Sequence, residues 1–349
     1  MAATNLSRNE KDAVGPGRAG ALLLPVSGLS QSSVLQVPFG RVRELMGHGR
    51  QVGRDGSIKL RRIAAFAGIV LSAGAYAQKP DDPLTRPIVG QRTAEWLAPR
   101  APARIFGNSY LVGFGGLSVA LIDTGEGLIL IDGALPQAAA PILENVRKLG
   151  FDPRRIRYIL STEPHFDHAG GLAALARDTG ATVIASSRGA EGLRTGRLAA
   201  DDPQRSLGHS FPAVARVRAI GDRGTLRLGR TVVTAHATPG HTMGSMSWSW
   251  RSCEARRCRT LVFASSLNPV SGEGYRYTAP ASRGILTGFG RSHARMKAVR
   301  CDILITAHPD PADGGSGYSD RPGACRAYAE RPERALAARL DEERTAARR

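Results

Sequence analysis

Short apolar runs separated by glycine and aspartate mark the chain between residues 104 and 132. The runs 109–112, 118–122 and 128–131 consist of Leu, Ile, Val, Ala, Ser and Tyr. Runs of this length, bounded by turn-forming residues, are typical of β-strands. The pattern predicts a strand meander in this part of the chain.

A helical period follows the meander. Ile142, Val146 and Leu149 lie three or four positions apart, and Gly150 is placed to end a helix that begins near Pro136. The rest of the chain alternates between the two kinds of element. Strands are expected at 156–160, 181–185, 231–235, 245–250, 260–264 and 303–306, helices at 170–178 and 324–349, and a polar loop at about 193–215.

Strand runs therefore alternate with helix-strand units in both halves of the chain, although no sequence repeat is visible. This succession fits an α/β fold in which two central sheets are covered by helices on the outside. The chain has 349 residues, of which 42% are hydrophobic, so it can bury a core of ordinary size.

The first 77 residues are predicted to be a leader and not part of the fold. Lys59, Arg61 and Arg62 precede an apolar run at 63–75, and Ala75-Tyr76-Ala77 is a cleavage site of the small-residue type. We assign residues 1–56 to an upstream leader consistent with a misassigned start, 57–77 to a signal peptide and 78–349 to one domain. A retained anchor is the alternative, but the apolar run is too short for a membrane span. The expected location is periplasmic or secreted.

The formal net charge of +18, from 48 basic and 30 acidic residues, raises the question of a nucleic-acid partner. The basic residues are almost all arginine and are scattered along the chain without a dense block. Aromatic residues, which could stack on bases, make up only 5% of the chain. We therefore expect no nucleic-acid partner and, after signal cleavage, no membrane partner.

Four cysteines lie in the last hundred residues: Cys253, Cys258, Cys301 and Cys325. An even number behind a signal peptide favours disulfides, because exported proteins meet an oxidising compartment. Four cysteines allow three pairings, and the sequence does not choose among them. Cys253 and Cys258 flank a short polar turn and could close a hairpin, which would leave Cys301 with Cys325. Neither pair has the two-residue spacing of a zinc knuckle.

The segment after the predicted strand 156–160 contains a cluster of potential metal-binding side chains. It places Glu163, His165, Asp167 and His168 within six residues, just before a predicted helix. Strand ends are where layered α/β folds position ligands. His241 lies in a glycine-flanked turn between two later strands, and a third strand ends shortly before His308.

A single histidine after a strand is more often a polar loop residue than a ligand, and we interpret His209, His236 and His293 as structural or surface residues. The joint pattern is different. Three strand ends supply six ligands of the kinds that zinc accepts, enough for two three-ligand sites with positions left for solvent.

The stretch from about Trp96 to Tyr328 resembles the metallo-β-lactamases, and specifically their subclass B3. The resemblance rests on the metal-binding segment together with Phe106-Gly-Asn-Ser-Tyr110, Gly116-Leu-Ser118, Ile131-Asp-Gly133, Thr238-Pro-Gly-His-Thr242, Ser265-Ser-Leu-Asn268 and Cys301-Asp302 followed by Thr306-Ala-His-Pro309. It implies a four-layer αβ/βα sandwich with two central mixed sheets and outer helices.

The resemblance also implies a dinuclear zinc centre. The first zinc ion would take Glu163, His165 and His241, and the second would take Asp167, His168 and His308. The departure from the family pattern H-x-H-x-D-H is at Glu163, where the family usually has histidine. A carboxylate is a competent zinc ligand, but its negative charge should weaken the Lewis acidity of the first zinc ion.

The implied activity is hydrolysis of the β-lactam amide bond in penicillins, cephalosporins and carbapenems, which confers antibiotic resistance. A hydroxide that bridges the two zinc ions would attack the carbonyl, and Asp167 would orient it. Ser266 and Asn268 would bind the substrate carboxylate, and Trp96 would form a wall of the pocket. The resemblance further implies the Cys301–Cys325 disulfide, and we expect a monomer whose partner is the small-molecule substrate.

Two alternatives stay open at this stage, because a fold and its metal site do not fix the substrate. One is another hydrolase of the same superfamily, such as a lactonase or a thioesterase. The other is a zinc-binding protein without full turnover, impaired by Glu163.

Overall fold

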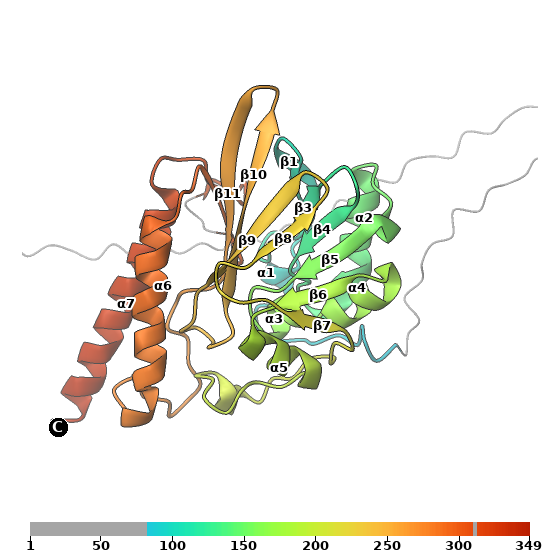
Figure 1. The fold of residues 1–349 in the computed structure, drawn as a ribbon. Helices are drawn as coiled ribbons and strands as arrows, with labels where there is room; N and C mark the ends of the chain where they lie inside the picture. The colour runs from blue at the N-terminus through green and yellow to red at the C-terminus, as the bar shows by residue number, and fades with distance from the viewer. Residues whose placement is uncertain (1–81, 310–312) are drawn as a thin grey trace, which may run out of the picture. The chain divides into compact units, whose positions relative to one another are not determined.

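The computed structural model describes residues 82–309 and 313–349 (Figure 1). The predicted upstream leader, the signal peptide and the proposed cleavage site therefore lie outside the described residues. Within those ranges, every helix is too short or too polar to span a membrane.

Seven strands form the first sheet, and they follow one another in sequence order. They are β1 (Ala103–Phe106), β2 (Ser109–Leu111), β3 (Ala120–Asp123), β4 (Leu128–Ile131), β5 (Ile156–Leu160), β6 (Thr182–Ala185) and β7 (Val217–Ala219). The strands from β1 to β4 pair antiparallel, and those from β4 to β7 pair parallel. The sheet is therefore mixed, with an N-terminal meander as predicted.

Five strands form the second sheet, in the order β12-β11-β10-β9-β8. They are β8 (Thr225–Leu228), β9 (Thr231–Ala237), β10 (Met246–Glu254), β11 (Arg257–Ala264) and β12 (Ile303–Thr306). The strands β8 to β11 pair antiparallel, whereas β12 pairs parallel to β11. This sheet is mixed as well.

Helices cover the outer faces of both sheets (Figure 1). The first sheet packs against α2 (Ala139–Lys148), α4 (Leu172–Thr179) and α5 (Ser187–Thr195), and the second packs against α6 (Arg283–Ala298) and α7 (Ala324–Ala346). Shorter elements are α1 (Thr93–Trp96), α3 (Phe166–Ala169), η1 (Pro136–Ala138), η2 (Pro153–Arg155), η3 (Arg205–Leu207) and η4 (Pro280–Ser282). The layers are those of the expected αβ/βα sandwich.

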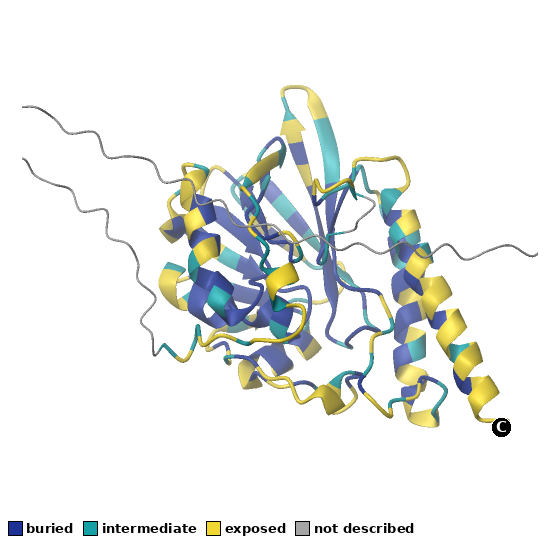
Figure 2. Ribbon diagram, turned by 180° about the vertical axis from the view of Figure 1, so that it is seen from behind, coloured by how far each residue is buried: buried dark blue, intermediate teal, exposed yellow. Residues whose placement is uncertain are grey.

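Alternation along the central strands explains why the sheets lie between helical layers. In β4, Leu128 and Leu130 face the helices of the first sheet, while Ile129 and Ile131 face the second sheet. In β11, Phe263 points between the sheets and Val262 points toward α6 and α7. A strand that is apolar on both faces must be covered on both faces, and Figure 2 shows these strands as buried.

The sequence pattern predicted the central strands and the helices α2, α4 and α7, but it missed α6 entirely. This 16-residue helix contains Gly284, Gly288 and Gly290. Glycine is a poor helix former, so local propensity gives little sign of this helix. Its burial of Ile285, Phe289 and Met296, among other residues, stabilises it through tertiary packing. The short strands β1, β7 and β8 and the helix α5 were not predicted either.

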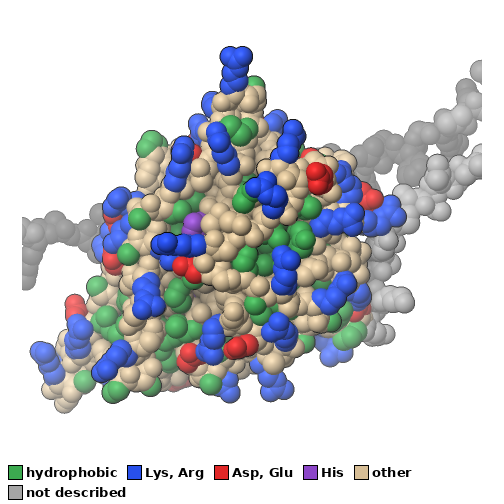
Figure 3. Space-filling model, viewed as in Figure 1, with side chains coloured by type: hydrophobic (Ala, Val, Ile, Leu, Met, Phe, Trp, Pro, Cys, Tyr) green, Lys and Arg blue, Asp and Glu red, His purple; other side chains and the backbone are tan. Residues whose placement is uncertain are grey.

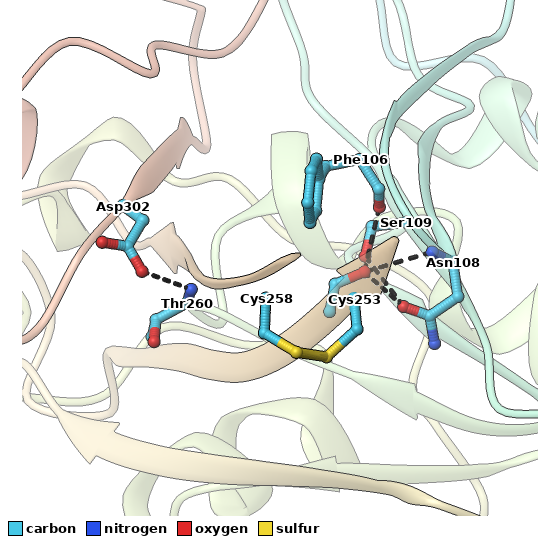
Figure 4. Close-up of a disulfide and its surroundings, with 8 residues drawn as sticks. Phe106, Asn108, Ser109, Cys253, Cys258, Thr260 and Asp302 are labelled. Atoms are coloured by element: carbon cyan, nitrogen blue, oxygen red, sulfur yellow. Dashed lines mark hydrogen bonds between the residues drawn. A yellow bond between two sulfur atoms is a disulfide. The ribbon is translucent and has the colours of Figure 1, made fainter. Parts of the chain in front are cut away.

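Both disulfides considered from the sequence are present, namely Cys253–Cys258 and Cys301–Cys325. Cys253 and Cys258 are direct partners across the β10–β11 hairpin, as Figure 4 shows. The second disulfide joins the segment before β12 to the first turn of α7. Each therefore links segments that are already neighbours in the fold.

Arginine and lysine side chains are spread over the face seen in Figure 3, interspersed with acidic and apolar side chains. Several are paired, as in Arg188 with Asp201 and Lys297 with Glu333. On this face the basic side chains are scattered and form no single block.

Candidate metal centre

The segment after β5 begins at a buried carboxylate. Asp132, which directly follows β4, accepts hydrogen bonds from the Thr162 amide at 2.7 Å and from the Thr162 hydroxyl at 2.6 Å. Since β4 and β5 are parallel neighbours, their carboxyl ends meet at one edge of the sheet. The bonds to Asp132 therefore fix the direction in which the chain leaves β5 toward the predicted ligands.

A tight turn between β9 and β10 presents His241. Gly240 has a φ of 134°, and a Cβ at this position would lie 2.7 Å from the ring of Phe289. Only glycine fits this conformation and this close approach. The turn closes through a hydrogen bond from the Thr238 amide to the Ser245 carbonyl at 3.0 Å.

The fold brings all six predicted ligand residues together in two groups. One group is Glu163, His165 and His241, and the other is Asp167, His168 and His308. Within each group, one potential ligand atom from every residue lies within 4.8 Å of the others. The described residues thus contain two three-residue clusters with the composition expected of zinc sites.

Each histidine of the first group has one ring nitrogen held by the protein. His165 Nε2 lies 3.2 Å from the carboxylate of Asp202, whose side chain is 2% exposed. His241 Nδ1 donates to the carbonyl of Asn268 at 2.8 Å. The other ring nitrogens, His165 Nδ1 and His241 Nε2, face Glu163 and lie 3.9 Å and 3.4 Å from its Oε1.

The second group repeats this arrangement. His168 Nδ1 lies 3.4 Å from Asp132, and His308 Nδ1 donates to the carbonyl of Gly116 at 3.1 Å. The two Nε2 atoms then face each other at 3.1 Å, and that of His308 lies 3.3 Å from Asp167 Oδ2. In each histidine, the ring nitrogen that faces away from the cluster is called the outer nitrogen, and the one that faces into it the inner nitrogen. An acceptor that binds the outer nitrogen fixes the tautomer of the imidazole and orients its inner nitrogen, as in zinc enzymes.

Glu163 is the residue that best tests whether a cation fits here. Its Oε2 accepts the Ser266 amide at 3.0 Å, while its buried Oε1 has no hydrogen-bond partner. Unpaired buried carboxylate oxygens are costly. Oε1 faces one ring nitrogen each of His165, His168 and His241, at 3.9 Å, 3.2 Å and 3.4 Å, so the carboxylate and three imidazoles converge on one point. A metal cation satisfies the carboxylate and the imidazoles at once, so the donor set fits zinc.

The charges of the two groups are strongly coupled. Burial alone raises the pKa of the Glu163 carboxyl, but His168, His241 and His165 lower it to about 2. Burial likewise lowers the pKa of His168, yet Asp167, Glu163 and Asp132 raise it to about 10. The carboxylates thus stabilise positive charge at the centre of the cluster.

Sequence reasoning missed Asp202 and Gln204, which lie in the polar loop between α5 and β7. Besides holding His165, Asp202 accepts the backbone amide of Gln204 at 2.8 Å. The side-chain Nε2 of Gln204 lies 3.1 Å from His241 Nε2 and 3.4 Å from His165 Nδ1. No metal-binding motif includes these residues, and only the Asp-Asp-Pro-Gln turn composition marked the segment.

The predicted substrate contacts also lie next to the ligands. The Trp96 ring centroid is 5.8 Å from that of His308. Ser266 is buried and donates its amide to Glu163, and Asn268 is exposed while its carbonyl accepts His241. All three therefore border the candidate metal centre, and their roles in substrate binding stay a prediction.

A family model described as the metallo-beta-lactamase superfamily matches residues 104–253. Among solved structures, one described as the first B3 metallo-beta-lactamase with an active-site glutamic acid is 68% identical, with a TM-score of 0.74. It covers 76% of this chain, and this chain covers 99% of it. The B3 enzyme BJP-1 of Bradyrhizobium japonicum is 32% identical, with a TM-score of 0.66 over 73% of this chain and 99% of its own.

Curated relatives are more distant. Two hydroxyacylglutathione hydrolases, from Rhodospirillum rubrum and Anaeromyxobacter dehalogenans, are 27% and 34% identical over 49% and 41% of this chain. The matches span 68% and 41% of the lengths of these two proteins. The similarity to this kind of hydrolase is therefore partial, whereas the similarity to the solved B3 structures extends over nearly their whole length.

Proposed function

Because this chain belongs to the metallo-beta-lactamase superfamily and matches solved subclass B3 enzymes over nearly their whole length, we propose that it hydrolyses the amide bond of β-lactam antibiotics. The observation that carries the proposal is the convergence of six candidate ligand residues on one centre, where the buried Glu163 Oε1 has no hydrogen-bond partner. An activity of this kind would confer resistance to these antibiotics.

Two zinc ions would be held by the two groups of the metal centre, Glu163, His165 and His241 for the first, and Asp167, His168 and His308 for the second. When bound, zinc acts as a Lewis acid, which polarises a carbonyl group and lowers the pKa of bound water toward neutral pH. The fixed outer nitrogens of the four imidazoles would hold the ligands in place without reorganisation.

Asp167 is the proposed catalytic carboxylate. Burial alone raises its pKa, but His168 and His308 lower the pKa well below its ordinary range, so the group is ionised at neutral pH. An ionised carboxylate accepts hydrogen bonds only, and it can therefore orient an attacking water through the proton of that water. Ser266 and Asn268 would bind the substrate carboxylate, and Trp96 would pack against the substrate beside His308.

Glu163 gives the first group one negative charge that an all-histidine group lacks. This charge should reduce the Lewis acidity of the first zinc ion, because a carboxylate donates more charge to the ion than a neutral imidazole does. We expect turnover that is lower than that of an all-histidine site, or a shifted pH optimum, but not an inactive enzyme.

The proposal is tested on protein that begins at Gln78, with zinc content measured beside hydrolysis of a chromogenic cephalosporin and a carbapenem. We expect about two zinc ions per chain, and turnover that a chelator abolishes and added zinc restores. Glu163→Ala should lower both zinc content and turnover, whereas Asp201→Asn, a change of an exposed carboxylate outside both groups, should alter neither.

A thioester of glutathione serves as the competing substrate in the same assay, because the curated relatives are hydroxyacylglutathione hydrolases. Faster hydrolysis of the thioester than of either lactam would overturn the lactamase proposal in favour of a thioesterase. One zinc ion per chain, with no hydrolysis of any ester or lactam, would instead indicate a zinc-binding protein without turnover, and no zinc at all would contradict both. Export and a monomeric state are part of the same proposal.

A further inference from the structure

The loop of residues 265–270, which follows β11 and carries Ser266 and Asn268, is held by side chains from the C-terminal part of the chain. The Tyr328 hydroxyl donates to the carbonyl of Ser265 at 2.9 Å. His293 Nε2 donates to the carbonyl of Leu267 at 3.3 Å. The Tyr277 hydroxyl donates to the carbonyl of Val270 at 3.0 Å. Tyr328 lies on α7, His293 on α6, and Tyr277 in the segment before η4.

The same loop contacts two ligand residues of the first group. The Ser266 amide donates to Glu163, and the Asn268 carbonyl accepts from His241. The Val270 amide also donates to the Asn268 carbonyl at 3.0 Å, so Val270 and His241 share one acceptor. A displacement of Val270 would therefore move the atom that orients the His241 ring.

Glu343, near the end of α7, fixes the segment that carries Tyr277. Its carboxylate accepts the amides of Tyr277 at 3.1 Å and Thr278 at 2.8 Å, and the hydroxyl of Thr278 at 2.8 Å. Arg339, one turn earlier, donates to the same carboxylate at 2.9 Å. The Glu343 side chain is 7% exposed, and hydrogen bonds to a buried carboxylate are stronger than those between neutral groups.

Tyr277 connects the segment held by Glu343 to the 265–270 loop through its hydroxyl group. Its side chain is fully buried and packs with Ile285, Phe289 and Leu336 from α6 and α7. The packing leaves the hydroxyl little freedom except toward Val270. Four hydrogen-bonded steps therefore connect the last helix to a predicted metal ligand, from Glu343 through Tyr277, Val270 and Asn268 to His241.

We propose that Glu343 and Tyr277 are positioning residues for the metal centre: through the 265–270 loop, the C-terminal helix sets the orientation of His241 and the place of the substrate-facing Ser266 and Asn268. The part that concerns substrate rests on the proposed lactamase function. The part that concerns the loop and His241 does not.

The test uses Tyr277→Phe, which removes one hydroxyl and keeps the packing, and Glu343→Gln, which replaces one acceptor oxygen by a donor. Glu333→Gln is the matched control, because Glu333 lies on the same helix but pairs with Lys297 at the surface. Three quantities are measured on each full domain: backbone hydrogen exchange in a peptide covering 265–272, zinc affinity by chelator competition, and KM and kcat for a cephalosporin.

Loss of one buried hydrogen bond should speed exchange of the 265–272 peptide about fivefold in Tyr277→Phe, and by more in Glu343→Gln. Zinc affinity should fall about threefold to tenfold, since Tyr277 and Glu343 lie two and three steps beyond Asn268, the outer partner of His241, and such changes have a smaller effect than loss of that partner. KM should rise by more than kcat falls, and Glu333→Gln should match the unchanged protein in all three measurements.

Unchanged exchange in 265–272 and unchanged zinc affinity in Tyr277→Phe would overturn the proposal. So would equal changes in Glu333→Gln, because they would show a general effect of α7 on stability. A protein that binds zinc and shows the expected exchange pattern but hydrolyses no lactam would contradict the proposed function and leave the positioning role supported.

Discussion

At the scale of single residues, the metal centre depends on acceptors that lie behind the ligands. Asp202, Asn268, Asp132 and Gly116 each bind the outer nitrogen of one histidine. With Glu163 in the first group, both groups consist of one carboxylate and two imidazoles. Each group can therefore neutralise one of the two charges of a zinc ion, and the two sites should be more alike in affinity than in an enzyme with three histidines at the first site.

Asp202 gives the first prediction at this scale. Asp202→Ala should lower the zinc affinity of the first group about tenfold to a hundredfold, the range found when outer-shell partners of metal ligands are removed. Chelator competition with zinc measures the change. The neighbouring Asp201→Asn is the control, since Asp201 is about half exposed and pairs with Arg188. Equal affinity in the two variants would mean that the Asp202 contact does not orient His165.

At the scale of secondary-structure elements, α6 shows how packing can stabilise a helix with low propensity. Gly288 faces the turn that precedes His241, and a Cβ there would lie 3.1 Å from the carbonyl carbon of Pro239 and 3.2 Å from the Gly240 amide. Gly290 is exposed, and a Cβ there would meet no atom within 4 Å. Gly288 thus allows close packing of the helix against the turn, whereas Gly290, in the same helix, has no such packing role.

This difference predicts opposite signs for two alanine substitutions. Gly290→Ala should raise the free energy of unfolding by about 0.5–1 kcal/mol through helix propensity. Gly288→Ala gains the same propensity, but overpacking against Pro239 and Gly240 costs about 1–3 kcal/mol, so the net effect should be destabilising. Urea unfolding of the metal-free domain measures both. A stabilising Gly288→Ala would show that the 239–240 turn can move without cost.

At the scale of the whole molecule, several contacts connect the part of the chain after β11 to the second sheet and the segments beside it. The Cys301–Cys325 disulfide, the parallel pairing of β12 with β11 and the Glu343 contacts all connect the helices of the second sheet to the rest of the fold. Since Glu343 makes several of these contacts, we expect the free energy of unfolding to depend on whether its carboxyl group is protonated.

Burial alone raises the pKa of Glu343, but hydrogen bonds from Thr278, Arg339 and Tyr277 lower it to about 2, against 4.5 for a free glutamate. As the pH falls, the unfolded chain takes up this proton before the folded protein does. The contribution of Glu343 to stability is therefore fully present well above pH 4.5, and it is lost as the pH falls from about 4.5 to about 2.

Urea unfolding of the protein and of Glu343→Gln from pH 7 to pH 3 checks this prediction. The difference in unfolding free energy should be constant between pH 7 and about 5.5 and should shrink below pH 4.5. Glu333→Gln provides the comparison for an exposed carboxylate on the same helix. A difference that stays constant down to pH 3 would contradict the role given to the Glu343 carboxylate.

The sequence by itself determined the central strands and three of the longer helices, and it singled out the six residues that the fold brings together as the candidate metal centre. Strands such as β4 are apolar on both faces, and their residues are detected because local composition and burial agree. Glu163, His165, Asp167 and His168 were detectable because ligands close together in sequence after a strand form a local pattern. His241 and His308 could be identified as candidate ligands only in combination with that pattern.

Only the tertiary structure decided which acceptors lie behind those ligands and how the C-terminal helices reach them. Asp202 lies 37 residues from His165, and Glu343 lies 66 residues from Tyr277, so neither contact leaves a local signal in the sequence. The helix α6 was hidden for a related reason, because Gly288 matches the turn it packs against and the three glycines lower the helix propensity of the segment. Interactions between distant segments are selected by three-dimensional fit, and a pattern read along one chain does not contain them.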